Sequence, residues 1–182
     1  MLRIEDNLKE DISFFRQLMN VLTRARKLAV DPNAKISDYR KSMIVFIIFG
    51  AAVSVLVFLL GVFAGFDVFN YVAIILGIVI VIFAAIALIY YNSMVKKLMS
   101  KQDSDTKNTL VLDKEGIEFT SGSNQIKIGW KDIKFMRIEK DVVFFFPEQY
   151  ETMPVLASHA RYKDKIQRSL KEDGVNIKKI GK

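Results

Sequence analysis

Hydrophobic and polar residues are segregated along this chain into long blocks. Residues 43–66 and 68–91 form two runs without a charged side chain, and Asp67 alone separates them. As a helix rising 1.5 Å per residue, each run spans about 36 Å, more than the roughly 30 Å of a bilayer's hydrocarbon core. A continuous helix also satisfies its own backbone hydrogen bonds in lipid. The pattern therefore predicts a two-helix transmembrane hairpin over residues 43–91.

The composition of the two runs bears on alternatives to this hairpin. Their β-branched segments are also typical of buried strands in a soluble protein, but strands require breaks roughly every 4–8 residues, which these runs lack. Gly61 and Gly65 form a GxxxG pair, and Gly77 belongs to a looser pair of small residues. We treat these glycines as candidate helix-packing positions, either within the hairpin, which we favour, or in a dimer.

Basic residues flank the hairpin and predict its orientation. Arg40 and Lys41 precede it, Lys96 and Lys97 follow it, and the connecting turn carries only Asp67. Loops rich in Lys and Arg stay on the cytoplasmic side. We therefore expect a two-pass protein of the cell membrane with both termini cytoplasmic and the Asp67 turn outside.

The first thirty residues show helical periodicity and predict an amphipathic N-terminal helix over residues 1–30. Residues 31–42, which begin with Asp31-Pro32, then form a joint. The apolar face of this helix either lies on the inner leaflet or packs on protein, and its acidic first half favours protein. The residues expected on that face are Ile4, Leu8, Ile12, Phe15, Met19 and Leu22.

The hydrophobic period changes to two beyond a polar linker at residues 92–108. Short alternating segments separated by Gly and Asn turns run from residue 109 to Pro147, and a helical pattern follows and ends at Gly174. Residues 109–182 therefore predict a small α+β domain, an antiparallel β-meander closed by a C-terminal helix. Residues 175–180 are a possible edge strand.

One motif in this region resembles a known family. Two membrane helices, then Trp130, Asp132 and Ile133 at a turn, and an aromatic strand at residues 143–146 are similar to the bacterial YcxB-like family. The resemblance implies a reduced pleckstrin-homology-like (PH-like) C-terminal domain. It implies no general activity and no catalytic residue.

Charge adds a candidate binding surface. The chain has 182 residues with 27 Lys and Arg against 20 Asp and Glu, a net charge of +7. Because PH-like sheets often contact acidic headgroups, the resemblance implies contact with membrane lipid, although ordinary solubility charge explains the same residues equally well. A nucleic-acid partner is not expected, since basic and aromatic residues do not interleave on one strand face. The candidate lipid- or partner-facing basic residues are Lys127, Lys131, Lys134 and Lys140.

The inventory of reactive side chains disfavours an enzyme. The chain has no Cys and one His, His159, so a zinc site or a Cys- or His-based catalytic pair lacks its components. We expect His159 on the surface, and Asp132 as a turn-capping residue rather than a catalytic acid. We therefore predict no catalytic, cofactor-binding or metal-binding residues.

Two functional hypotheses follow. The leading one is a non-enzymatic integral membrane protein whose cytoplasmic PH-like domain and amphipathic N-terminal helix bind a protein partner at the inner leaflet. It would act as an accessory or regulatory subunit of a membrane complex, or as a homo-oligomer. The alternative is an immunity or self-protection protein against a membrane-active, bacteriocin-like peptide.

Overall fold

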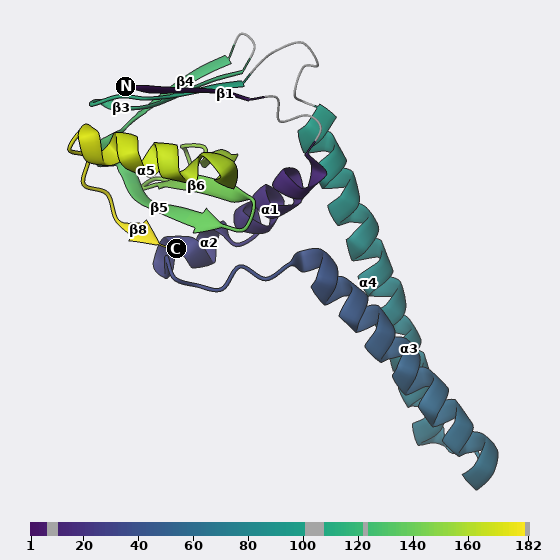
Figure 1. Ribbon diagram of the computed structural model, residues 1–182. Coiled ribbons are helices and arrows are strands. Elements are labelled where there is room, and N and C mark those ends of the chain that lie inside the picture. The colour runs from purple at the N-terminus through teal and green to yellow at the C-terminus, as the bar shows by residue number, and fades with distance from the viewer. Residues whose placement is uncertain (7–10, 101–107, 122–123, 181–182) are drawn as a thin grey trace. The chain divides into compact units, whose positions relative to one another are not determined.

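A computed structural model describes residues 1–6, 11–100, 108–121 and 124–180 of the chain (Figure 1). These residues divide into two compact units. The hairpin unit comprises Ser37–Lys96, and the β domain combines Met1–Ile36 with Lys97–Lys182. In the sequence, the hairpin unit is therefore inserted within the β domain rather than attached to one end of it.

Two long helices make up most of the hairpin unit. α3 spans Tyr39–Ala64 and α4 spans Val68–Ser100, and both are long and apolar enough to cross a membrane. Only 6% and 11% of their most apolar windows are buried, so they are not core helices of a soluble domain. This confirms two candidate spans. Both helices extend past the predicted limits of residues 43–91, because Asp38 caps α3 early and α4 continues into its polar end.

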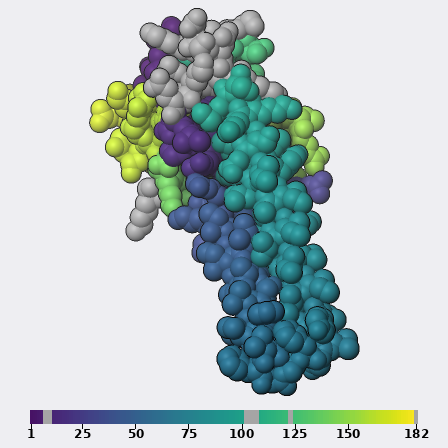
Figure 2. Space-filling view, turned by 90° about the vertical axis from the view of Figure 1, so that its right-hand side faces the viewer, coloured from purple at the N-terminus to yellow at the C-terminus, as the bar shows by residue number. Residues whose placement is uncertain are grey.

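The two helices approach each other closely at a pair of glycines. The Cβ of any residue replacing Gly77 would collide with Ser54 Oγ and lie 2.9 Å from the Gly50 carbonyl oxygen. Ser54 Oγ donates to Gly50 O at 2.9 Å and approaches the Ile74 carbonyl of the other helix at 3.4 Å. Figure 2 shows the helices in contact along the hairpin. Gly77 therefore lies at an interhelical contact, and its neighbours there are Gly50 and Ser54.

The other two predicted packing glycines serve the turn of the hairpin. A side chain at Gly61 would collide with the Phe66 ring at 2.5 Å, and that ring stacks on Tyr71 with centroids 5.4 Å apart. Gly65 ends α3 with a φ of 93°, a backbone conformation that favours glycine. A Cβ on Gly65 would meet no atom of the described residues within 4 Å, so Gly65 does not pack against α4 as part of a GxxxG surface.

The β domain contains two sheets. The first has the order β1-β2-β3-β4 and is antiparallel throughout, and the second has the order β7-β6-β5-β8 with only β8 parallel to its neighbour. The single predicted meander is thus divided, because a 3-10 turn at Trp130–Asp132 separates β4 from β5. The expected edge strand near the C-terminus is β8. The strands are β1 (Leu2–Asp6), β2 (Asn108–Leu112), β3 (Gly116–Ser121), β4 (Asn124–Gly129), β5 (Ile133–Glu139), β6 (Val142–Pro147), β7 (Leu156–His159) and β8 (Lys179–Ile180).

The hydrophobic core lies between the sheets and the C-terminal helix α5 (Lys163–Glu172). Ile166 and Leu170 of α5 join residues of both sheets in one buried cluster, which includes Ile117 and Phe145. The helix begins only at Lys163, because residues 156–159 pair with β6 as a strand. This agrees with the predicted α+β domain of strands and a C-terminal helix.

The N-terminal segment differs most from its prediction. Residues 2–6 form β1, which pairs with β2, and α1 (Ile12–Leu22) begins only after the Asp11 cap, followed by α2 (Ala25–Val30). One helix over residues 1–30 is therefore wrong. Over so few residues the spacing of apolar positions fits a strand as well as a helix, and pairing with β2 selects the strand.

The buried face of α1 also differs from the expected one. Phe14, Phe15 and Val21 are buried, whereas Ile12 and Leu22 are exposed. Met19 is half-buried and Ile4 is buried on β1, while Leu8 lies outside the described residues. Apolar residues occupy two overlapping faces of α1. The face that contains Phe14 is buried because it packs against β6, whereas Ile12 and Leu22 remain exposed.

Candidate functional site

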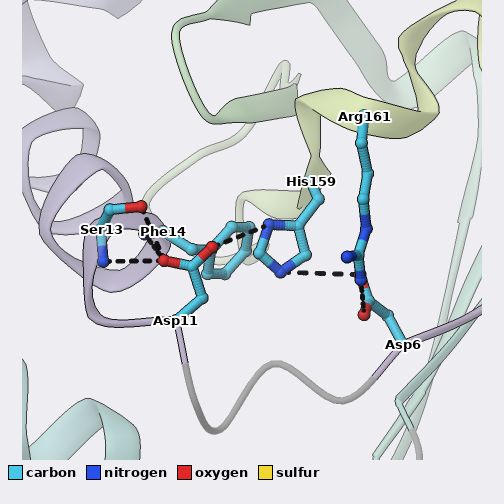
Figure 3. Close-up of polar contacts among 6 residues, drawn as sticks. All are labelled: Asp6, Asp11, Ser13, Phe14, His159 and Arg161. Atoms are coloured by element: carbon cyan, nitrogen blue, oxygen red, sulfur yellow. Dashed lines mark hydrogen bonds and ion pairs between the residues drawn. The ribbon is translucent and has the colours of Figure 1, made fainter.

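His159, at the end of β7, lies between two carboxylates from the N-terminal segment (Figure 3). Its Nε2 is 3.6 Å from Asp6 Oδ2, and its Nδ1 is 3.4 Å from Asp11 Oδ2. The ring is only 6% exposed and packs against Phe14, with ring centroids 4.6 Å apart. The expectation of a surface histidine is therefore wrong. Strand β1 and the start of α1 supply the groups that bury it.

Both carboxylates have further partners. Arg161 donates to Asp6 Oδ1 at 2.5 Å, whereas Asp6 Oδ2 accepts no hydrogen bond within the described residues. Desolvation opposes the charge of Arg161, but the Asp6 carboxylate outweighs it and raises the pKa of Arg161. An arginine and a histidine thus face one buried acid at the end of β1.

Asp11 is at once the N-cap of α1 and an acid facing His159. Its Oδ1 accepts from the backbone N–H of Ser13 at 2.9 Å, from the Ser13 hydroxyl at 2.6 Å and from the Phe14 N–H at 3.1 Å. Burial opposes ionisation of Asp11, but these hydrogen bonds, with a smaller contribution from His159, lower its pKa below the ordinary value. The N-cap is therefore anionic at neutral pH.

This cluster is suited to holding segments together rather than to catalysis. Both imidazole nitrogens face carboxylates, and the nearby Ser13 hydroxyl donates to Asp11 instead of to the imidazole. A nucleophile–base pair, which requires the hydroxyl on the ring nitrogen, is not formed here. Within the described residues no grouping of His, Asp and Glu is arranged to hold a metal ion. The cluster therefore forms a polar joint between β1, α1 and β7.

Two cations of β5 hold the chain that leads from α2 toward the membrane hairpin. Arg137, which is buried, donates to the carbonyl oxygens of Pro32 and Ala34, both at 2.8 Å, and pairs with Glu139. Lys134 Nζ donates to the Ala29 carbonyl at 2.9 Å, at the C-terminal end of α2. Cations at that end of a helix stabilise its unpaired carbonyls. We call Lys134 and Arg137 the joint clamp.

The four lysines predicted to form one basic face are not brought together. Lys127 lies on β4 of the first sheet and pairs with Glu115 at 2.7 Å, whose hydrogen bond and charge raise the pKa of Lys127. Lys131 is exposed in the turn between the sheets, and Lys140 is exposed in the turn after β5. Lys134 belongs to the joint clamp. Because the chain switches sheets at Trp130–Asp132, alternation along the sequence does not translate into a shared face.

The residues of the family-like motif build the connection between the two sheets. Trp130 donates its indole N–H to the Asp113 carbonyl at 2.8 Å and packs near Phe145, with ring centroids 6.2 Å apart. The backbone carbonyl of Asp132 accepts from the Glu148 N–H at 2.8 Å, and Ile133 is buried in the core. These contacts connect the two sheets and are structural.

Exposed apolar side chains recur on the outer surface of α1 and α2. Ile12 and Leu22 are 42% and 38% exposed, and Val30 is 88% exposed. Arg26 and Lys27 are exposed on the same short helix as Val30. We call these five residues the outer helical surface.

Comparison with known proteins does not place this chain in a family. No protein-family model, no curated protein and no solved structure matches it.

The sequence analysis did not predict Asp11 or Arg137 as site residues, although the sequence contains partial signals for both. Asp11 followed by Ser13 before an apolar run is a recognisable N-cap pattern. Arg137 stands between the apolar residues Met136 and Ile138 of its strand, and a buried arginine requires an internal partner. The identity of that partner, the carbonyls of residues 32 and 34, has no signal in the sequence.

Proposed function

We propose that this chain is a non-enzymatic, two-pass membrane protein whose β domain lies at the inner leaflet and binds a protein partner. In this role it is an accessory or regulatory subunit of a membrane complex. The insertion of the hairpin within the β domain supports the membrane topology, and the outer helical surface supports the protein partner.

The observation that carries the proposal is the pairing of β1 with β2. Strand β1 precedes both apolar helices and β2 follows them, yet their residues are in antiparallel register from Leu2 opposite Leu112 to Asp6 opposite Asn108. Two paired strands occupy one compartment, so the chain between them crosses the bilayer an even number of times. Two spans and two termini on the same side are the arrangement that this pairing supports.

The distribution of charge supports the inner side. Arg40, Lys41 and Lys96 are exposed at the open end of the hairpin, whereas Asp67 is the charged residue of the closed end. Basic residues next to membrane helices remain on the cytoplasmic side. The spans themselves hold no ionisable side chain between residues 43 and 66 or between 68 and 91 other than tyrosine, which disfavours a conducting or proton-relay role.

The outer helical surface supports a protein partner. Arg137 and Lys134 hold α2 and the joint against β5, so the exposed apolar residues of α1 and α2 are presented on an anchored element. Apolar residues bordered by charged ones on a rigid helix are typical of recognition surfaces.

We further propose that the β domain is PH-like, as the resemblance to the YcxB-like family suggests. In support, one antiparallel and one mainly antiparallel sheet enclose one core, and α5 contributes residues to that core. The membrane hairpin would then be an insertion after the first strand of such a domain.

Site-directed labelling tests the membrane placement. Because the chain lacks Cys, single substitutions Asp67→Cys and Lys165→Cys create unique thiols at the hairpin turn and on the exposed face of α5. An impermeant maleimide on intact cells should label the first and not the second. If only Lys165→Cys were labelled, the topology would be the reverse of the one proposed. If both thiols were labelled, the two-pass arrangement would be wrong.

Photo-crosslinking tests the partner. A photoreactive residue at Leu22 or Val30 should give one discrete heavier product in membranes, whereas the same residue at Gln125, exposed on β4, should not. The substitution Leu22→Asp should abolish the product obtained from Val30. A chain that crosslinks nowhere on α1 or α2, and that purifies alone in gentle detergent, would overturn the partner-binding role.

A further inference from the structure

His159 connects the outer strands of the two sheets of the β domain. β1 is an edge strand of the first sheet, and β7 is an edge strand of the second. Asp6 is the last residue of β1 and Asp11 is the N-cap of α1, and both face the imidazole of His159 at the end of β7 (Figure 3). The ring therefore attaches the end of β1 and the start of α1 to the second sheet.

The number of protons on His159 determines how well the ring fits this position. A neutral imidazole has one N–H group and one nitrogen with a lone pair, whereas an imidazolium has two N–H groups. Nε2 lies 3.6 Å from an oxygen of Asp6, and Nδ1 lies 3.4 Å from an oxygen of Asp11. A neutral ring therefore turns a lone pair toward one of the carboxylates, and only the imidazolium attracts both.

The other groups around the ring favour this positive charge. Arg161 pairs with Asp6 through Oδ1, whereas Oδ2, the oxygen that faces the ring, accepts no hydrogen bond within the described residues. On the β6 side, the residue opposite His159 is the apolar Val142, and the side chain of the adjacent Asp141 is exposed. The two acids and the arginine together leave one negative charge at the ring, which an imidazolium neutralises.

We propose that His159 is a pH-sensitive latch, which holds the end of β1 and the start of α1 to β7 when it is protonated and loosens both when it loses that proton. Histidine is the side chain that ordinarily changes charge between pH 5 and pH 8, and His159 is the only histidine of the chain. Because α1 carries Ile12 and Leu22, the latch also controls how firmly part of the outer helical surface is held. The latch depends neither on a protein partner nor on the membrane topology.

The direction of the pH response follows from these charges. Burial opposes ionisation of Asp11, but its hydrogen bonds lower its pKa, so this acid stays anionic across the range in which histidine titrates. The attraction between the ring and both acids is therefore present while the ring is protonated, and it is lost as pH rises and the ring becomes neutral. The attachment of α1 should weaken between pH 6 and pH 8.

Amide hydrogen exchange of the full chain in detergent micelles tests the latch. After correction for the intrinsic pH dependence of exchange, opening of the N-terminal half of α1 should increase about fivefold or more between pH 6 and pH 8. Amides of β3, an inner strand of the first sheet, should show no such increase. The single histidine gives one pair of ring nitrogen signals in NMR spectra. The midpoint of their titration should coincide with the midpoint of the exchange response.

Three variants separate His159 from other titrating groups. His159→Gln keeps a polar side chain that takes up no proton, so it should lack the response, although it retains the Met1 amino group, which lies 3.5 Å from Asp173 and changes charge in a similar pH range. Asp11→Asn preserves a good helix cap but removes one of the two charges at the ring, and should reduce the response to roughly twofold. The exposed Asp164→Asn on α5 should retain the whole response.

Any of three results would overturn the latch: α1 exchange that is the same at pH 6 and pH 8, a response that persists in His159→Gln, or an equal increase in β3, which would indicate global unfolding. Should His159→Gln fail to fold, Asp11→Asn decides the question, because it keeps both the cap and the histidine. A full response in Asp11→Asn would then refute the latch. These measurements leave the membrane placement and the protein partner to their own experiments.

Discussion

Leu2 lies directly opposite Leu112 in one antiparallel sheet, although both candidate membrane helices separate the two residues along the chain. The β domain therefore needs its first strand to be complete. Insertion of the hairpin also fixes both of its ends to the same folded unit.

Weakening β1 should consequently destabilise the whole β domain. Ile4 is buried on β1 opposite Leu110, so Ile4→Ala should lower the free energy of unfolding by about 2–5 kcal/mol. Arg3→Ala, on the exposed side of the same strand, should change it by less than about 0.5 kcal/mol. Urea unfolding in detergent, followed by the fluorescence of Trp130, measures both. Equal midpoints for Ile4→Ala and the natural chain would refute the role of β1.

The acids around His159 should be energetically coupled to it. His159→Gln removes a ring that faces both Asp6 and Asp11, and we expect a loss of about 1–3 kcal/mol in unfolding free energy. In a double-mutant cycle with Asp6→Asn, the two losses should be non-additive. The exposed Asp164→Asn on α5 serves as the control. Strict additivity would mean that His159 and Asp6 are neighbours without an interaction.

Acid should destabilise the β domain through two carboxylates with lowered pKa values. Hydrogen bonds from the Gly116 and Glu115 N–H groups lower the pKa of Asp113 below 3.8, and Asp11 is lowered as described above. A depressed folded pKa gives stability that is complete above about pH 5 and is lost as pH falls through the folded value.

Urea midpoints measured between pH 7 and pH 3 should therefore decline on the acid side. Asp113→Asn should show a smaller decline than the natural chain, because its side chain no longer takes up a proton. Gln125→Ala, which removes no ionisable group, should retain the full decline. An unchanged slope in Asp113→Asn would show that its pKa is the same in the folded and unfolded states.

The close approach of the hairpin helices should be sensitive to a single methyl group. Gly77→Ala places a Cβ against Ser54 Oγ and the Gly50 carbonyl, so the helices must separate. We expect a lower thermal midpoint of helical circular dichroism in detergent, and partial recovery in Gly77→Ala/Ser54→Ala because only the hydroxyl is removed. Ala51→Val, on an exposed side of α3, is the control. A Gly77→Ala chain as stable as the natural one would place the helix contact elsewhere.

The joint clamp should protect the connection to the hairpin from proteolysis. Arg137→Met removes the donors to Pro32 and Ala34, and charge-assisted hydrogen bonds of this kind contribute about 1.5–3 kcal/mol each. Trypsin cleavage after the exposed Lys35 should then accelerate by about tenfold or more, as followed by mass spectrometry. Lys131→Met, which removes an exposed cation, should leave the cleavage rate unchanged. Equal rates for both variants would show that other contacts hold the joint.

Some local features of the β domain could be read from the sequence, whereas the candidate site could not. Apolar residues recur at every second position in the strand after the Trp130 turn and at every third or fourth position in the C-terminal helix, and both spacings are visible locally in the sequence. The burial of His159 depends on Asp6 and Asp11, which reach it from the other end of the chain. Arg137 likewise meets carbonyls that are distant in sequence, and carbonyls have no residue-specific signature.

The sequence by itself determined the pair of apolar helices and the presence of a separate α+β domain. Lipid as a solvent requires an uninterrupted apolar stretch, and such a stretch is visible in any window that contains it. Tertiary structure alone decided that residues 2–6 are a strand, which stripe of α1 is buried, and where the chain changes sheets. In each of these cases two local conformations satisfied the same short pattern, and contacts with residues far away along the chain made one of them lower in free energy.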